Sequence, residues 1–202
     1  MANAVIEGYA AAANELIPRY DALAAETVLG PVLHLVPAAP CRVLDVGTGT
    51  GRNAAWFAAQ GHRVTACEPV GAFRLSAAER YGTGTVGWLD DTLPTLEATK
   101  SLGETYDFVL LSAVWQHLEA ADRPVAMAAL ADLMAPQGIL VMSVRHGPGA
   151  PGRPVYPTSD DEVLKTARAH GLAQTFMAHT ESVGAANKAA GVTWSWIAFG
   201  LA

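Results

Sequence analysis

The sequence has few charged residues, only two cysteines and no cluster of basic residues. Charged residues make up 16% of the 202 residues, and the net charge is −6. Proteins bind nucleic-acid phosphates through basic stripes, so this balance makes a nucleic-acid partner unlikely. Two cysteines, Cys41 and Cys67, do not form a disulfide framework, and no metal-ligand spacing surrounds either of them. We therefore expect a reduced, cytoplasmic protein without a bound metal.

The sequence also lacks the apolar segments that membrane insertion or secretion requires. Every apolar stretch is interrupted by Glu, Asp, Arg or Pro, which excludes a membrane span. Met1 to Glu7 contain no basic region followed by an apolar block, so we expect no secretory signal. Hydrophobic residues make up 51% of the chain, which excludes a disordered protein. The length suits one α/β domain, and we predict a single domain over residues 1–202.

Predicted strands and helices alternate along the chain from about residue 40. The predicted strands are 42–46, 63–67, 85–89, 107–112 and 139–144, followed by two closing strands at 172–178 and 192–199. The predicted helices are 51–60, 72–81, 93–102, 123–134 and one that begins at the capping box of Ser159 and Glu162. Residues 10–36 also have a helical composition, with breaks at Pro18 and Pro31. This order predicts a Rossmann-like α/β fold, a doubly wound and mostly parallel sheet with helices on both faces.

Residues 147–157 form the one compositionally biased segment. They hold Pro148, Pro151, Pro154 and Pro157 among three glycines. Prolines at this density exclude a helix or a central strand. A loop of this length in a compact domain is usually functional or disordered.

The most informative motif is the run from Val43 to Asn53, VLDVGTGTGRN. It predicts a buried strand that ends in Asp45 and turns through alternating glycines into a helix. Glycines at such a turn let the backbone approach a ligand closely. A turn between a strand end and a helix N-terminus is a usual place for a nucleotide-like ligand.

Carboxylates stand at the ends of three predicted strands, and they help to identify the ligand. Asp45 ends the first strand, Glu68 follows the second, and Asp90 and Asp91 follow the third. The segment 49–54 fits a relaxed dinucleotide motif, with Glu68 at a suitable distance for a ribose. However, Asp45 would then stand beside a pyrophosphate, where like charge is unfavourable. A cationic ligand without phosphate fits these acids better.

S-adenosylmethionine, with its ammonium and sulfonium groups, is such a ligand. Asp45 can serve its amino-acid end, and the two carboxylate oxygens of Glu68 can accept both ribose hydroxyls. Asp90 or Asp91 can accept a hydrogen bond from the adenine amine. The glycines let the chain pass under the methionine and the ribose.

At these motifs the sequence resembles the class I S-adenosylmethionine-dependent methyltransferases of the small-molecule type. The resemblance rests on residues 43–51, Glu68, 90–94 and 106–112, and on the turn at 136–140, and it covers roughly residues 40–145. It implies a seven-stranded sheet with an antiparallel last strand, and short N-terminal helices that close over the cofactor. Residues 1–39 would then form a helical lid, and residues 40–202 the Rossmann-like core.

The resemblance also implies a set of cofactor-binding residues. They are Asp45, Gly47, Thr48, Gly49, Gly51, Glu68, Asp90, Asp91 and Ser112. In the family, a single Asp often stands four residues before a Leu-Pro pair. Here Asp90 and Asp91 precede Leu93 by three and two positions, so both stay candidates for the adenine contact.

Candidates on the acceptor side follow the fourth and fifth strands. His117 can take a proton from a nucleophile, or it can be a helix-start histidine bonded to backbone. His146 is a second candidate catalytic histidine. Arg145 can hold a substrate carboxylate in a bidentate pair, or it can form a structural salt bridge.

The predicted function is methyl transfer from S-adenosylmethionine to a small molecule at O, N, S or C, by in-line displacement. Residues 112–115 lack the Asn/Asp-Pro-Pro-aromatic arrangement of amino-methylating DNA enzymes. Two alternatives stay open, a nucleotide-dependent oxidoreductase and a non-catalytic module that binds the cofactor. The acceptor and the oligomeric state are not determined by the sequence.

Overall fold

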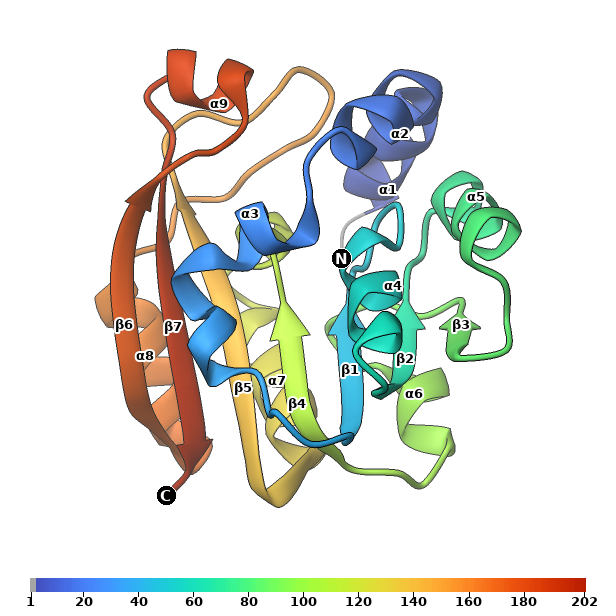
Figure 1. Cartoon of the computed structure of the whole chain (residues 1–202). Helices are drawn as coiled ribbons and strands as arrows, with labels where there is room; N and C mark the ends of the chain where they lie inside the picture. The colour runs from blue at the N-terminus through green and yellow to red at the C-terminus, as the bar shows by residue number, and fades with distance from the viewer. Residues whose placement is uncertain (1–2) are drawn as a thin grey trace.

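The protein forms a seven-stranded sheet covered by helices on both faces (Figure 1). The computed structural model describes residues 3–202, so Met1 and Ala2 of the predicted domain and lid lie outside the described residues. The strands are β1 (Arg42–Val46), β2 (Arg63–Cys67), β3 (Val86–Leu89), β4 (Tyr106–Leu111), β5 (Met134–His146), β6 (Leu172–Glu181) and β7 (Thr193–Leu201). Their order is β3-β2-β1-β4-β5-β7-β6, with β7 antiparallel to both neighbours and the other pairs parallel. The predicted fold class is confirmed.

Each face of the sheet has its own hydrophobic core. On one face lie α3 (Ala25–Leu29), η1 (Gly30–Leu35) and α4 (Arg52–Ala59), and on the other lie α6 (Glu97–Ser101), α7 (Arg123–Asp132) and α8 (Asp160–Ala169). Phe57 of α4 packs on Phe108 of β4 on the first face, and Leu130 of α7 belongs to the core of the second. Each such side chain contributes about 1.5–3 kcal/mol of burial free energy. No helix among residues 3–202 is long and apolar enough to cross a membrane.

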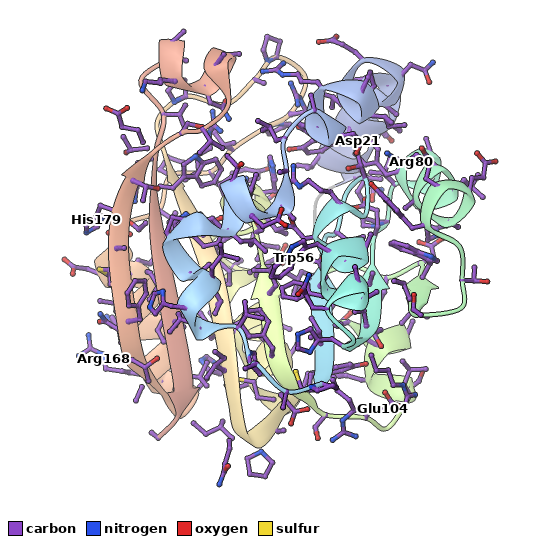
Figure 2. All side chains as sticks on the ribbon, in the orientation of Figure 1. Asp21, Trp56, Arg80, Glu104, Arg168 and His179 are labelled. Carbon is purple, nitrogen blue, oxygen red and sulfur yellow. The ribbon has the colours of Figure 1, made fainter. Side chains whose placement is uncertain are left out.

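The N-terminal helices pack at the edge where the parallel strands end. They are α1 (Asn3–Ala11) and α2 (Ala13–Asp21), and both contact α5 (Gly71–Tyr81). Tyr9 of α1 and Leu16 of α2 pack with Phe73 of α5. An ion pair between Asp21 and Arg80 also joins α2 to α5 (Figure 2). The prediction that Pro18 breaks the helix was wrong, because Pro18 lies inside α2, with its side chain at the exposed surface.

Two predicted elements differ in extent. The predicted helix 93–102 is only the short α6, because Leu93 and Leu96 turn into the core. The predicted fifth strand begins earlier, since the turn at residues 136–138 is a bulge within β5 that shifts its register against β4. Gly138 is required there because a Cβ would lie 2.6 Å from the carbonyl oxygen of Tyr106.

The proline- and glycine-rich segment crosses the same edge of the sheet and is anchored at its far end. The buried Arg123 donates hydrogen bonds to the carbonyl oxygens of Tyr156 and Pro157, at 3.2 and 3.0 Å. It also pairs with Glu162 at 2.5 Å. Ser159 is the N-cap of α8, as predicted, since the Glu162 amide donates to Ser159 Oγ. The Glu162 carboxylate of the predicted capping box accepts from Arg123 and from Thr158 Oγ1. The loop is therefore fixed to the core helices before it reaches the strand ends.

Candidate functional site

A cavity of about 1160 Å³ lies at the carboxyl ends of the parallel strands. Its walls come from the glycine turn after β1, from α1 and α2, from the loop 147–155, and from α9 (Ala185–Ala189) with the neighbouring end of β7. The volume is at the upper end of the range for ligand pockets. Eight of the residues predicted from the sequence line it: Asp45, Gly47, Thr48, Gly49, Glu68, Ser112, His117 and Arg145.

The glycine turn has a left-handed backbone at each of its three glycines. Gly47, Gly49 and Gly51 have φ values of +68°, +59° and +79°. A Cβ on Gly47 would lie 2.6 Å from Val114, whereas one on Gly49 would have no atom within 4 Å. Gly49 therefore borders open space in the cavity, where a ligand can approach the backbone.

Gly51 has a different role from the one predicted, because it does not line the cavity. A Cβ at this position would lie 2.6 Å from the Trp88 ring and 2.8 Å from Ala77. This glycine therefore allows the turn and the start of α4 to pack closely on the neighbouring elements.

Glu68 is buried beside the turn and is held by backbone amides. The amide of Gly49 donates to its Oε2, and that of Val70 donates to its Oε1, each at 2.8 Å. Burial raises the pKa of Glu68 to about 7, although both amides act to lower it. Each oxygen keeps a second lone pair, so the carboxylate can accept two further hydrogen bonds.

Asp45 is buried at the end of β1. Its Oδ2 accepts a hydrogen bond of 2.6 Å from Thr48 Oγ1. Burial raises its pKa to about 6, while Thr48, Arg52 and the amide of Ala54 lower it. Two carboxylates with raised pKa values in one cavity favour a ligand that supplies positive charge or hydrogen-bond donors.

The structure does not bring Asp90 or Asp91 to the cavity. Asp90 is exposed and pairs with Arg74 at 2.7 Å. Asp91 Oδ2 accepts hydrogen bonds from the amide and the hydroxyl of Thr99, at 2.7 and 2.6 Å. Asp91 therefore fixes the start of the following segment, and both of its oxygens already have partners within the chain.

His146 also lies outside the cavity wall, although its neighbour Arg145 lines it. Successive residues of a strand point to opposite faces, which separates the two side chains. His146 Nε2 lies 2.7 Å from Ser195 Oγ and 3.2 Å from Asp160 Oδ1. Ser195 Oγ also contacts His179, which lies on the outer strand β6 (Figure 2).

His117 is buried in η2 (Trp115–His117) and joins the two segments above the cavity. Its Nδ1 lies 2.7 Å from the carbonyl oxygen of Pro154, which only an N–H can satisfy. The neutral ring therefore carries its lone pair on Nε2, which accepts the Tyr9 hydroxyl at 3.0 Å. Burial lowers the pKa of His117, and the charges of Arg145 and Arg153 act in the same direction.

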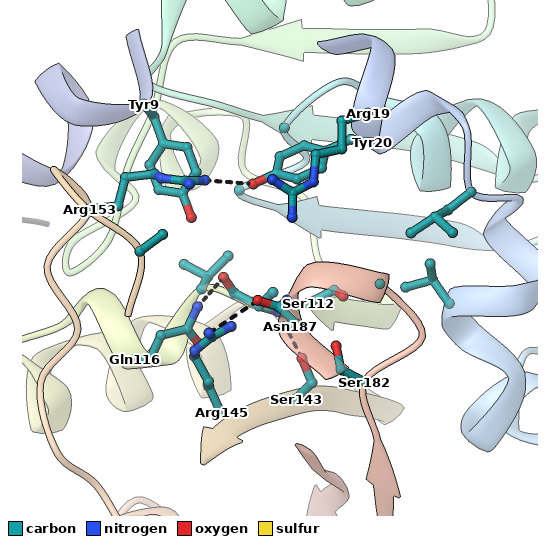
Figure 3. A pocket seen from close by; sticks show the side chains of 18 of the residues that line it. Tyr9, Arg19, Tyr20, Ser112, Gln116, Ser143, Arg145, Arg153, Ser182 and Asn187 are labelled. Atoms are coloured by element: carbon teal, nitrogen blue, oxygen red, sulfur yellow. Dashed lines mark hydrogen bonds between the residues drawn. The ribbon is translucent and has the colours of Figure 1, made fainter. Parts of the chain in front are cut away.

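The sequence patterns missed Arg153, Gln116 and Asn187, which line this cavity. Arg153 lies on one wall with Tyr9, and Gln116 and Asn187 lie on the other, beside Arg145 (Figure 3). None of the three belongs to a motif, since they come from the loop 147–155, η2 and α9. Ala113, two residues after the end of β4, has φ of +59°, which is strained for alanine and typical of functional sites.

Among residues 3–202, no group of His, Cys, Asp or Glu side chains is arranged to hold a metal ion. The acids lie at the ends of β1 and β2, where doubly wound sheets bind nucleotide-like cofactors.

The sheet order with one antiparallel strand, and the acid-lined glycine turn, define the class I methyltransferase fold. A family model described as "Methyltransferase domain" matches residues 12–182. The chain therefore belongs to this methyltransferase family. Comparison with curated proteins gives no match.

Solved structures share this fold at low sequence identity. One is 1,6-didemethyltoxoflavin-N1-methyltransferase of Burkholderia thailandensis, solved with 1,6-didemethyltoxoflavin and S-adenosylhomocysteine. It is 22% identical with a TM-score of 0.76, over 97% of this chain and 86% of that one. A TehB-like methyltransferase of Corynebacterium glutamicum is 20% identical with a TM-score of 0.67, over 98% of both chains. Magnesium protoporphyrin IX methyltransferase of Synechocystis, solved with S-adenosylmethionine, is 17% identical with a TM-score of 0.66, over 88% of this chain and 78% of that one.

Proposed function

We propose that this protein transfers a methyl group from S-adenosylmethionine to a small-molecule acceptor. The observation that carries the proposal is the buried Glu68 carboxylate, which is held against the Gly49 amide at the edge of the cavity. When bound, the cofactor supplies an electrophilic methyl group on a sulfonium. Of the similar structures, the Synechocystis one was solved with this cofactor, and the Burkholderia one with its product and a small molecule.

The residues at the cofactor end of the cavity fit this ligand. The open space at Gly49 accommodates a ribose or methionine moiety against the backbone. Glu68 accepts the ribose hydroxyls with its remaining lone pairs, and Asp45 serves the ammonium end. We propose Gly47, Thr48 and Ser112 as the remaining parts of this binding surface, since each lines the cavity.

We propose that residues 1–39 act as a lid and that the protein is a single domain. The His117 imidazole is hydrogen-bonded to Tyr9 on α1 and to the carbonyl oxygen of Pro154 on the loop. One side chain of the core thus joins the N-terminal helices and the loop, the two segments that cover the cavity. Gly8 packs directly on the carbonyl oxygen of Gly152, where any Cβ would clash. Such closure excludes water from the reacting groups and aligns the acceptor.

His117 is better suited to position Tyr9 than to act as a strong base. To accept a proton it would become an imidazolium in a buried site near Arg145 and Arg153, and its lowered pKa opposes this. We therefore propose His117 as a positioning residue for the lid. The acceptor must then lose its proton to solvent or arrive deprotonated.

Titration calorimetry with S-adenosylhomocysteine and with NAD(P) tests the proposal. Binding of S-adenosylhomocysteine without binding of NAD(P) is the expected result. The reverse result would establish the alternative of a nucleotide-dependent oxidoreductase. The acidic groups argue against that alternative, because Asp45 and Glu68 would face a pyrophosphate.

A non-catalytic cofactor-binding module is the second alternative. Such a protein would have a cavity without room for a methyl acceptor beside the cofactor. Here the cavity continues from the cofactor end past the end of β5 to Trp194 and α9, which favours an enzyme. We propose that the partner is a small molecule rather than nucleic acid, and that the protein is cytoplasmic.

A further inference from the structure

The far end of the cavity contains an arginine without a carboxylate partner. Arg145, at the end of β5, donates to the carbonyl oxygen of Pro148 at 2.5 Å and to Asn187 Oδ1 at 3.2 Å. Its guanidinium also lies over the Trp194 ring, 5.5 Å from the centroid. No salt bridge among residues 3–202 involves Arg145, so its charge is not neutralised within the chain.

A second arginine faces the same space from the loop. Arg153 lies over the Tyr9 ring, 5.3 Å from the centroid, and donates to Tyr20 Oη at 3.1 Å. Its Nε is buried without a hydrogen-bond partner, and no carboxylate in the described chain pairs with it. Figure 3 shows Arg153 and Arg145 on opposite walls of the cavity. The Arg153 charge also lowers the pKa of Arg145, after the larger effect of burial, as expected for two neighbouring cations.

The acids of the cavity do not compensate these two arginines. Asp45 and Glu68 lie at the ends of β1 and β2, with the ends of β4 and β5 beyond them in the sheet order. Glu15 and Glu181 also line the cavity, but both are exposed, and Glu181 pairs with Lys188 at 2.7 Å. A chain with a net charge of −6 thus keeps two partly buried arginines unpaired at one end of its cavity.

We propose that the methyl acceptor is an anion, and that Arg145 and Arg153 bind its carboxylate or equivalent acidic group. This inference rests on the proposed methyltransferase function. Guanidinium groups are well matched to carboxylates because two N–H groups donate in parallel. The bound anion supplies the partner that Arg153 Nε lacks and gives Arg145 a charged partner beside its carbonyl and amide acceptors.

A buried side-chain oxygen without a hydrogen-bond partner in the same cavity adds a second requirement for the methyl acceptor. Gln116 is buried, and its Nε2 donates to the carbonyl oxygen of Ala113 at 2.5 Å. Its Oε1 is buried without a partner. A buried oxygen of this kind requires a hydrogen-bond donor. The anionic molecule that receives the methyl group therefore also carries an N–H or O–H group.

A matched series of probes tests the charge requirement. The probes are 3-hydroxybenzoate, 3-hydroxybenzamide and 3-hydroxybenzylamine, which share a ring and a hydroxyl and differ in charge. Their affinities are measured by ligand-observed NMR titration, both with saturating S-adenosylhomocysteine and without it. We expect the carboxylate to bind about tenfold more tightly than the amide, and the amine to bind most weakly. Equal affinities, or no detectable binding of the carboxylate, would overturn the proposal.

Variants assign the preference to the two arginines. Arg145→Gln and Arg153→Gln should each reduce the preference for the carboxylate, and the double variant should abolish it. Arg168→Gln is the control, because it removes the same charge from the exposed surface of α8, away from the cavity (Figure 2). A preference that persists in the double variant contradicts the assignment.

The cofactor titration separates this proposal from the proposed function. If the arginines serve the acceptor, the affinity for S-adenosylhomocysteine changes by less than about threefold in both single variants. A larger loss would show that they hold the carboxylate of the cofactor, which overturns the acceptor assignment and leaves the methyltransferase proposal intact. Conversely, a protein that prefers the carboxylate probe but does not bind S-adenosylhomocysteine keeps the anion site and loses the proposed function.

Discussion

Replacing Glu68 tests the cofactor site most directly. Glu68→Ala removes the carboxylate that is available to accept the ribose hydroxyls, and it leaves the amides of Gly49 and Val70 without their acceptor. A hydrogen bond to a charged group contributes about 1.5–3 kcal/mol. Losing one such bond to the ligand predicts about 10- to 150-fold weaker binding of S-adenosylhomocysteine. Glu68→Gln should lie between the wild type and Ala, because its amide keeps one oxygen.

The assay is titration calorimetry with S-adenosylhomocysteine, together with circular dichroism to show that each variant is folded. Glu97→Gln is the charge-matched control, because Glu97 is exposed on α6, outside the cavity wall. An affinity in Glu68→Ala within about twofold of the wild type would refute the assignment of Glu68 to the site. The same loss in Glu97→Gln would show that net charge, rather than the carboxylate at this position, controls binding.

Three further predictions concern stability. Folding raises the pKa of Glu68 from 4.5 to about 7 and that of Asp45 from 3.8 to about 6, so the folded state keeps protons that the unfolded chain has lost. The free energy of unfolding should therefore fall as pH rises from 5 to 8. In urea titrations at several pH values, Glu68→Gln should lessen this fall by about 2–3 kcal/mol. If the variant shows the same dependence of unfolding free energy on pH as the wild type, the raised pKa of Glu68 is contradicted. Arg123→Gln should lower the free energy of unfolding by about 3 kcal/mol, because it leaves three carbonyl oxygens without the buried guanidinium and breaks its ion pair with the partly exposed Glu162. A loss under about 1 kcal/mol disagrees with this prediction. Gly51→Ala should lower the melting temperature by several degrees, because the new Cβ clashes with Trp88, whereas an alanine substitution at an exposed position should not. An unchanged melting temperature contradicts this packing.

The sequence predicted the sheet well because its signals are local. Short apolar runs, glycine turns and capping residues repeat at intervals suited to βαβ units, and only a few topologies accommodate that order. The antiparallel direction of β7 was implied by the family resemblance, since nothing local in Val192 to Phe199 gives its direction. Its position between β5 and β6 was shown by the structure. The early helices were predicted less well, because Pro18 was read as a break although it lies inside α2.

At the site, several residues predicted from the sequence line the cavity from the ends of central strands. Asp45 lies at the end of β1, and Glu68 and Ser112 directly follow β2 and β4. They reach the cavity because the ends of parallel strands meet at one edge of the sheet, and their role in cofactor binding stays a prediction. Asp90 and Asp91 follow the edge strand β3, and their side chains have partners in neighbouring segments. Strand ends near the centre of the sheet were therefore better guides than the strand end at its edge.

The sequence by itself determined the fold class and several of the strand-end residues that line the cavity, because both depend on residues close together in the chain. The tertiary structure decided the rest. Whether Arg145 or His146 faces the cavity depends on the orientation of a buried strand whose apolar run does not alternate. The Tyr9–His117 contact joins residues 108 positions apart. The two unpaired arginines face the same cavity only because a loop and a strand end both border it. Such contacts have no local signal, so the anionic nature of the acceptor could be inferred only once the chain was folded.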